Sequence, residues 1–240
     1  MSGHSKWSQI KRTKGALDAK RGILFSKLTK KIAIAVKEGG GPDPAMNFKL
    51  KGAIEKAREA GMPNDNVDRA IKKGSGADGG AIIQEVIYEG YGPFGTAFLV
   101  EAASDNTNRT FNNIKHIFSK NGGGIGATGS VAWQFVTRGQ ILVERDRDDL
   151  SEIQLAAIDA GAADVRESTE GLEIYTAPQD LDKIKQAVAA ADAKIAQSEI
   201  IKESTQGTDL TEEQKPKVDA LFAELENDDD VIAVHTSANL

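Results

Sequence analysis

One stretch of the chain decides its fold: residues 140–201, QILVERDRDDLSEIQLAAIDAGAADVRESTEGLEIYTAPQDLDKIKQAVAAADAKIAQSEII. Short apolar runs in this stretch alternate with segments whose apolar residues recur every three or four positions, which predicts strands that alternate with helices. Gly161 ends the first helix, and Pro178 helps to start the second. The expected elements are a strand at 141–144, a helix at 151–160, strands at 164–167 and 172–176, a helix at 180–191 and a strand at 194–201. This β-α-β-β-α-β order is typical of a ferredoxin-like domain.

The segments on either side of this stretch complete each other. Residues 81–136 predict strands at 85–89 and 96–103, a helix at 107–121 with Phe111 facing inward, and a strand at 130–136, but no final helix and strand. Residues 207–240 supply both, with a helix behind the capping box Thr211-Glu212-Glu213-Gln214 and a closing strand at 231–236. We therefore expect one split α/β domain, residues 79–138 and 205–240, with the ferredoxin-like domain, residues 139–204, inserted between its halves.

The N-terminal part predicts three short helices between residues 23 and 74. The first runs from Ile23 to the breaker Gly39-Gly40-Gly41-Pro42, the second starts at Pro44 with Phe48 on its apolar face, and the third starts near Asn64. Gly74 stands where a residue that follows a helix is often glycine. Residues 1–22 show little periodicity, which indicates an extended arm or a frayed helix. The expected fold class is thus a multidomain α+β protein: a three-helix domain at residues 1–78, then two α/β domains.

Charge is distributed very unevenly along the chain. Residues 1–75 hold 17 Lys/Arg and 7 Asp/Glu, a net charge of +10, whereas the remainder has a net charge of −16. Within residues 1–37 the only acidic residue is Asp18. Such a local positive field attracts polyanions, and Lys and Arg bind phosphates with release of counterions. The candidate nucleic-acid-binding residues are Lys6, Trp7, Lys11, Arg12, Lys14, Lys20, Arg21, Lys27, Lys30 and Lys31.

Two simpler readings of this region stay open. The lysines form a solvated face in one of them, and in the other Trp7 anchors the arm to its own domain instead of stacking on an unpaired base.

The sequence offers no anchor for catalysis, a metal or a cofactor. Cysteine is absent, and the three histidines are far apart. Residues 124–129 match G-x-G-x-x-G, but a helix precedes them and a strand follows, the reverse of a dinucleotide site. The run Asp228-Asp229-Asp230 predicts a turn with a solvated acidic patch. We expect a non-enzymatic protein without cofactor, metal or small-molecule substrate. No apolar run is long enough for a membrane span and no signal peptide is visible, so we expect a cytoplasmic location.

Several motifs resemble the YebC/PmpR family of probable transcriptional regulators, which is related to the mitochondrial translational activator of cytochrome oxidase. They are Gly3-His4-Ser5-Lys6-Trp7, Asp18-Ala19-Lys20-Arg21-Gly22, Asn66 to Gly74, Tyr88 to Pro93, Asp105 to Thr110, Phe118 to Gly123 and Gly129 to Trp133. The resemblance implies an N-terminal helical domain and two α/β domains, the second interrupted by the third. Two departures lie in loops: Phe94 stands where relatives often have glycine, and Gly124-Ile125 replaces a usual Asn-Leu.

The resemblance and the basic region together predict a DNA-binding transcriptional regulator. A translation factor that binds the ribosome or rRNA through the same arm is the alternative, because relatives have been linked to both roles. A third possibility is a protein-interaction scaffold that uses the acidic α/β domains, with the lysines merely solvated.

Overall fold

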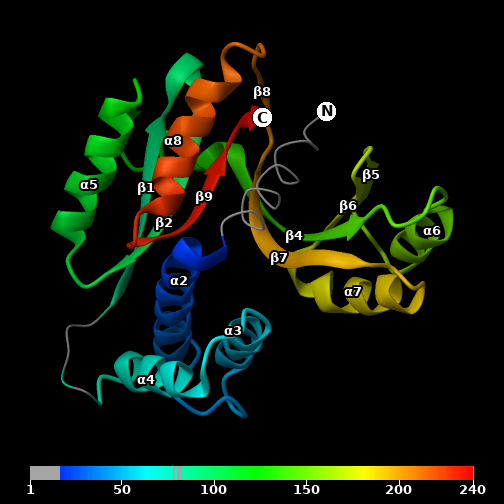
Figure 1. Ribbon diagram of the computed structural model, residues 1–240, viewed down its shortest axis with the longest axis horizontal. Coiled ribbons are helices and arrows are strands. Elements are labelled where there is room, and N and C mark those ends of the chain that lie inside the picture. The colour runs from blue at the N-terminus through cyan, green and yellow to red at the C-terminus, as the bar shows by residue number, and fades with distance from the viewer. Residues whose placement is uncertain (1–16, 78, 80–82, 240) are drawn as a thin grey trace. The chain divides into compact units, whose positions relative to one another are not determined.

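The computed structural model describes residues 17–77, 79 and 83–239, and in residues 17–20 it describes the backbone only (Figure 1). The chain forms two compact units. Their described parts are residues 17–131 with 214–234, here called the large unit, and residues 132–213 with 235–239, here called the small unit. The predicted division into three domains with the boundaries given above stays a prediction.

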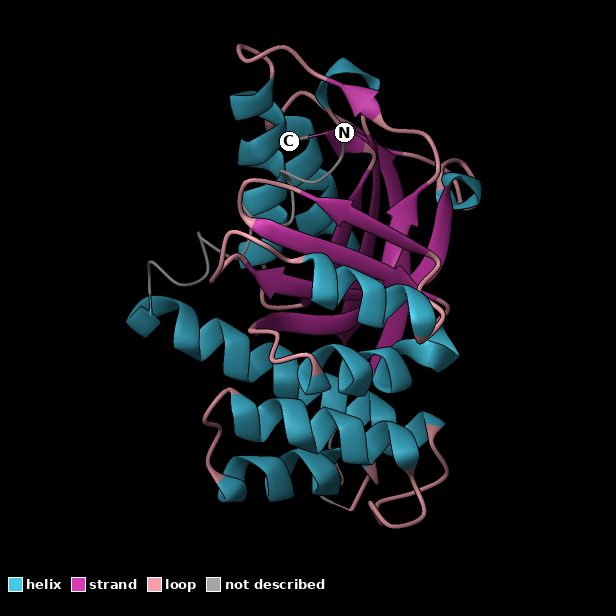
Figure 2. Cartoon of the chain, turned by 90° about the vertical axis from the view of Figure 1, so that its right-hand side faces the viewer, coloured by secondary structure: helices cyan, strands magenta, loops and turns pink. Residues whose placement is uncertain are grey.

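Three helices form the N-terminal part of the large unit, and Figure 2 shows that this group contains helices and loops only. They are α2 (Leu17–Glu38), α3 (Phe48–Glu59) and α4 (Asn64–Gly74). Side chains from all three share one apolar core: Leu28, Ile32, Ala35 and Val36 of α2, Leu50, Ile54 and Ala57 of α3, Val67 and Ala70 of α4, and Met62 between α3 and α4. The predicted three-helix arrangement is confirmed, and Leu17, the first described residue, is already helical six residues before the predicted start.

The start of α3 differs from the prediction because of a cap. Asn47, which is 1% exposed, accepts a hydrogen bond from the Leu50 N–H at 2.9 Å and so makes Phe48, not Pro44, the first helical residue. The Asn47 amide also donates to the carbonyls of Ala35 and Gly41, both at 2.8 Å. In this register Phe48 lies outside the core with 79% of its surface exposed, so its predicted burial is wrong.

Gly74 is the last residue of α4 instead of the residue after it. A Cβ atom at this position would lie 2.6 Å from the carbonyl oxygen of Ala33 and 2.8 Å from the Ala33 Cα. The glycine therefore permits close contact between the backbones of α4 and α2.

The first sheet, in the large unit, has the strand order β3-β1-β2-β9. Its strands are β1 (Gln84–Tyr91), β2 (Ala97–Ser104), β3 (Gly124–Ile125) and β9 (Val231–Thr236), the last from the far end of the sequence. Strands β1 and β2 are antiparallel and joined through the 3₁₀ turn η1 (Pro93–Gly95). The helices of this region are α5 (Thr107–Lys120) and α8 (Lys215–Asn227).

The two faces of β2 contact different parts of the large unit. On one face Phe98 packs edge-to-face against Phe118 of α5, with ring centroids 5.9 Å apart. Side chains alternate along a strand, and Ala103 on the other face joins a small core with Ala33 of α2, Ile83 and Ile232. Helix α2 thus takes part in two cores, its own and that of the first sheet.

Three expectations for this region are wrong. Residues 130–136 do not form a strand of the first sheet: they contain the 3₁₀ turn η2 (Ala132–Gln134) and the start of β4 (Phe135–Glu144). No side chain among the described residues caps α8, whose first turn contains Pro216. Phe111 is 39% exposed because it lies at the edge of the core, with its ring centroid 6.1 Å from that of Tyr88.

The second sheet, in the small unit, confirms the ferredoxin-like prediction. Its order is β5-β6-β4-β7, and every neighbouring pair is antiparallel. Two helices share its core, which includes Ile141, Leu172 and Ile184. The elements are β4, α6 (Ser151–Asp159), β5 (Asp164–Glu167), β6 (Gly171–Thr176), η3 (Pro178–Asp180), α7 (Leu181–Ala190) and β7 (Ile195–Ser204). Beyond β7, the short strands β8 (Thr208–Asp209) and β10 (Ala238–Asn239) pair in parallel. The α+β fold class is therefore confirmed.

Candidate nucleic-acid interface

The described part of the predicted interface lies on α2. Five of the predicted binding residues, Lys6, Trp7, Lys11, Arg12 and Lys14, lie outside the described residues, as does the side chain of Lys20. The other four, Arg21, Lys27, Lys30 and Lys31, have described side chains on α2.

These four cations have different environments. Arg21 is exposed, and its guanidinium lies 5.6 Å from the centroid of the Phe25 ring, within the range of a cation–π contact. Lys31 is half-buried. Lys27 and Lys30 reach residues at the end of α8 and the start of β9, which are about 200 positions away in sequence.

Lys27 donates a hydrogen bond from Nζ to the Glu226 carbonyl in the last turn of α8, at 2.6 Å. Carbonyls at the C-terminal end of a helix carry partial negative charge, so a cation there is stabilising. Burial lowers the pKa of the Lys27 ammonium, and the nearby Glu226 carboxylate opposes that effect.

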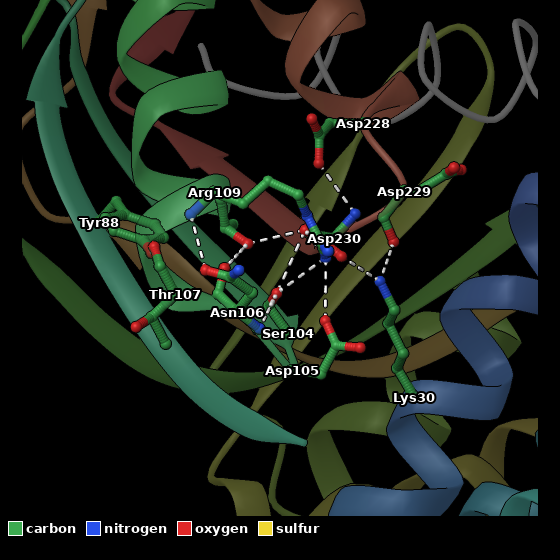
Figure 3. Close-up of polar contacts among 11 residues, drawn as sticks. Lys30, Tyr88, Ser104, Asp105, Asn106, Thr107, Arg109, Asp228, Asp229 and Asp230 are labelled. Atoms are coloured by element: carbon green, nitrogen blue, oxygen red, sulfur yellow. Dashed lines mark hydrogen bonds and ion pairs between the residues drawn. The ribbon is translucent and has the colours of Figure 1, made fainter. Parts of the chain in front are cut away.

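Lys30 connects α2 to the buried carboxylate of Asp230. Its Nζ donates to the Asp229 carbonyl at 2.5 Å and to Oδ1 of Asp230 at 2.6 Å. The other oxygen, Oδ2, accepts from Thr110 Oγ1 at 2.7 Å, from Arg109 Nη2 at 3.0 Å and from Ser104 Oγ at 3.3 Å. Figure 3 shows these groups converging on Asp230 from α2, from the end of β2 and from the first turn of α5. We call Lys30, Ser104, Arg109, Thr110 and Asp230 the Asp230 network.

The network keeps Asp230 ionised. Burial alone raises the pKa of a carboxyl group, but the hydrogen bonds from Lys30, Thr110 and Arg109 outweigh it and lower the pKa of Asp230 to about 2. The same contacts act on their partners: the hydrogen bond to Asp230 raises the pKa of Arg109.

The prediction of a solvated patch at residues 228–230 is wrong for Asp230, which is only 6% exposed. Its partners Arg109 and Thr110 belong to one of the motifs that resemble the family, yet nothing local in the sequence links that motif to the C-terminal aspartates. The same motif supplies the cap of α5, because Asn106 Oδ1 accepts from the Arg109 N–H at 3.0 Å.

A cleft of about 560 Å³ lies beside the Asp230 network. Positively and negatively charged side chains both line it: the cations are Lys30, Lys73 and Arg109, and the anions are Asp105, Asp228, Asp229 and Asp230. Lys30 and Arg109 pair with carboxylates of the same chain, so this cleft carries little of the positive field that a polyanion would need.

Exposed cations and apolar side chains come together instead on α3. Met46, just before the Asn47 cap, and Phe48, the first residue of α3, are 84% and 79% exposed, and Lys51 and Arg58 of α3 are exposed as well. The sequence interpretation missed this surface because it assigned Phe48 to the core. The signal was the Asn47 cap, which fixes the helical register.

The glycine-rich segment at residues 124–129 is not wholly the predicted loop, because Gly124–Ile125 form β3, and its end binds a carboxylate of its own chain. Glu89 of β1 is 5% exposed and accepts hydrogen bonds from the N–H groups of Gly129, at 2.6 Å, and Val131, at 2.8 Å. These N–H groups are therefore committed to Glu89, which accounts for the absence of a strand at 130–131 in the described structure.

Within residues 17–77, 79 and 83–239, no group of three or more His, Asp or Glu side chains is arranged to hold a metal ion. Over the same part of the chain, every helix is too short or too polar to cross a membrane.

Two family models match this chain and together cover nearly all of it. Residues 5–77 match the TACO1/YebC protein N-terminal domain, and residues 83–238 match the TACO1/YebC second and third domain. Among curated proteins, one from Thermoanaerobacter pseudethanolicus is 48% identical over 100% of this chain and 98% of its own length. One from Enterococcus faecalis is 47% identical over 99% of both. Both are named probable transcriptional regulatory proteins.

A solved structure shows the same fold. The crystal structure of a conserved hypothetical protein from Aquifex aeolicus aligns with a TM-score of 0.82 and 40% identity, over 92% of this chain and 91% of that one. With both family models and these full-length relatives in agreement, the chain belongs to the TACO1/YebC family.

Proposed function

We propose that this protein is a non-enzymatic regulator of gene expression that binds nucleic acid through its basic N-terminal region, most directly as a DNA-binding transcriptional regulator. The observation that carries the proposal is the charge separation, +10 in residues 1–75 against −16 in the remainder. The names of the relatives support a role in transcription. The acidic remainder repels polyanions, so binding is one-sided.

The contacts of the described lysines refine which residues do the binding. Lys27 and Lys30 donate to groups of the same chain, so phosphate binding by either would first cost those hydrogen bonds. The proposed contact surface therefore depends on the cations before residue 21, on Arg21 and Lys31, and on Trp7 as a stacking residue.

A second function shares this surface: a translation factor that binds rRNA. The exposed Phe48 beside Lys51 favours it, because RNA is recognised mainly through unpaired bases that stack on aromatic side chains. In either role we propose a cytoplasmic protein.

Salt titration tests the shared proposal. Replacement of Lys11, Arg12, Lys20 and Arg21 by alanine should weaken nucleic-acid binding and reduce the slope of log K against log salt by up to about 3.5, because each lost phosphate contact removes about 0.9. The matched control replaces four cations of the acidic part, Lys115, Lys183, Lys185 and Lys217, and should leave the slope unchanged. An unchanged slope in the first variant would contradict the proposal.

Crosslinking in cells separates the two functions. If the protein is a transcriptional regulator, sequencing of the crosslinked nucleic acid recovers a limited set of DNA segments. Recovery of mainly rRNA would reject the transcriptional role and support the translational one.

A further inference from the structure

We infer that the exposed face of α3 is a binding site for unpaired nucleotides, in which Phe48 stacks on a base and Lys51 and Arg58 bind the backbone phosphates. This inference rests on the proposed function and adds to it a second contact surface, distinct from the N-terminal arm.

The first observation is an apolar pair that is open to solvent. Met46 and Phe48 are 84% and 79% exposed, the largest values among the exposed large apolar side chains of the described chain. Burial of an aromatic ring normally contributes strongly to folding, so a ring this exposed gives little to stability and is available to a ligand.

The second observation is the spacing along the helix. Phe48, Lys51, Glu55 and Arg58 follow one another at intervals of three, four and three residues, which places them in one row on the surface of α3. Gly52 lies next to this row, and a Cβ atom added there would meet nothing within 4 Å. The helix surface next to the row is therefore open at Gly52.

The third observation is a groove beside the row. Its volume is about 360 Å³, which is in the range of small-molecule sites, and it is lined by Pro44, Ala45, Lys51, Ile54, Glu55 and Arg58. Phe48 does not line this groove, which continues the surface beyond Lys51, the residue that the groove and the row share, and its two cations suit the phosphates of a strand whose base stacks on Phe48.

Charge selects the occupant. The helix α3 carries Lys49, Lys51, Lys56 and Arg58 against two acids, Glu55 and Glu59, and it belongs to the basic part of the chain. Lys49 forms an ion pair with Glu38 at 2.9 Å on the exposed surface. Such exposed pairs are weak, so a phosphate can replace Glu38 as the partner of Lys49 at little cost. An aromatic ring amid cations is the arrangement by which proteins hold single-stranded nucleic acid, whereas an apolar protein partner would be disfavoured by the surrounding lysines.

The site predicts a preference for single strands. A base inside a duplex does not offer its face to Phe48, so duplex DNA gains only the phosphate contacts of Lys51 and Arg58. The carboxylate of Glu55 lies in the groove wall and can accept a hydrogen bond from an exocyclic base amine, as acidic side chains do in base recognition.

The test measures binding of the full chain to a fluorescent single-stranded oligonucleotide and to its duplex by anisotropy. Phe48→Ala should weaken single-strand binding roughly 5- to 150-fold, the range expected for one lost stacking contact, and leave duplex binding unchanged. Phe48→Trp should restore single-strand binding. The control Leu155→Ala removes a 59% exposed side chain from α6 in the small unit and should change neither affinity.

The outcomes separate this inference from the proposed function. If the wild-type protein binds and Phe48→Ala matches it on single strands, the α3 site is rejected while the proposed function stands. If the wild-type protein binds no nucleic acid at low salt, both are rejected. Equal losses for single strand and duplex would also reject stacking, and thermal unfolding of each variant checks that the fold is kept. A photoreactive residue at position 48 should crosslink to the single strand, and failure to do so would contradict direct contact.

Discussion

The Asp230 network and the exposed face of α3 both contain a lysine and an arginine, but those of the network bind carboxylates whereas those of α3 face solvent. In the network, the ammonium of Lys30 contacts Asp230 and the Asp229 carbonyl, and the guanidinium of Arg109 contacts two aspartates. On α3, Lys51 and Arg58 are exposed on the same helix as the exposed ring of Phe48. A count of lysines and arginines gives the sign of the field, but the fold decides which cations still face solvent and which ones hold the chain together.

Removal of the Asp230 carboxylate should destabilise the Asp230 network and lower the stability of the fold. Asp230→Asn leaves Lys30 without its carboxylate and Arg109 with Asp105 alone, so we expect the free energy of unfolding to fall by about 3 kcal/mol, as when one partner of a buried ion pair is removed. Chemical denaturation measures this value. The matched control is Asp229→Asn, whose exposed side chain lies next in sequence and should change stability by less than about 0.5 kcal/mol. Equal effects would show that the network adds nothing specific.

Protonation of Asp230 at low pH should reversibly remove the stability that the Asp230 network contributes. The pKa of Asp230 is about 2 in the folded chain against an ordinary value of 3.8, so its contribution is fully present above pH 4 and is lost as the pH falls through 2. That contribution amounts to about 2 kcal/mol. Stability measured from pH 5 to pH 2 should therefore fall less in Asp230→Asn than in the wild-type protein. Parallel curves would contradict the assignment.

Two helical glycines contrast a packed position with an exposed one: Gly74 lies against the backbone of α2, and Gly52 has nothing within 4 Å of an added Cβ atom. Gly74→Ala places a methyl group against the backbone of Ala33 and should destabilise the protein by about 2 kcal/mol through overcrowding. Gly52→Ala, on the open face of α3, should instead stabilise it by roughly 0.5–1 kcal/mol, because alanine is the better helix former and nothing lies nearby. The signs of the two shifts in melting temperature check this pair, and a loss of stability in Gly52→Ala would show that the α3 face is covered.

Local patterns predicted most of the fold. The strands at 164–167 and 231–236 have the predicted bounds, and the ferredoxin-like order is confirmed, because turns and apolar periodicity encode such elements within a few residues. The strand β4 was divided in two by the prediction, since its first half has little apolar alternation. The start of α3 was misplaced because a proline outweighed the Asn47 cap.

The Asp230 network could not be predicted in the same way. Its bonds join residues 200 and 121 positions apart, and no local pattern marks Lys30 as the partner of Asp230. Phe94 shows the reverse case, a local signal with a clear physical reason. Its φ is 60°, a left-handed conformation in which glycine is unstrained, and this fits the glycine that the family resemblance leads us to expect there.

The distance in sequence between Lys30 and Asp230 also sets an order of events during biosynthesis. At about 5–20 residues per second, the 200 residues between them take roughly 10–40 seconds to synthesise. Until residue 230 is made, Lys30 has no Asp230 carboxylate to bind, and from the synthesis of β2 onwards the first sheet ends at β2, whose open edge can pair with another chain. Newly made protein is therefore most exposed to mispairing just before β9 is made, and one short segment closes the sheet and neutralises Lys30 in the same step.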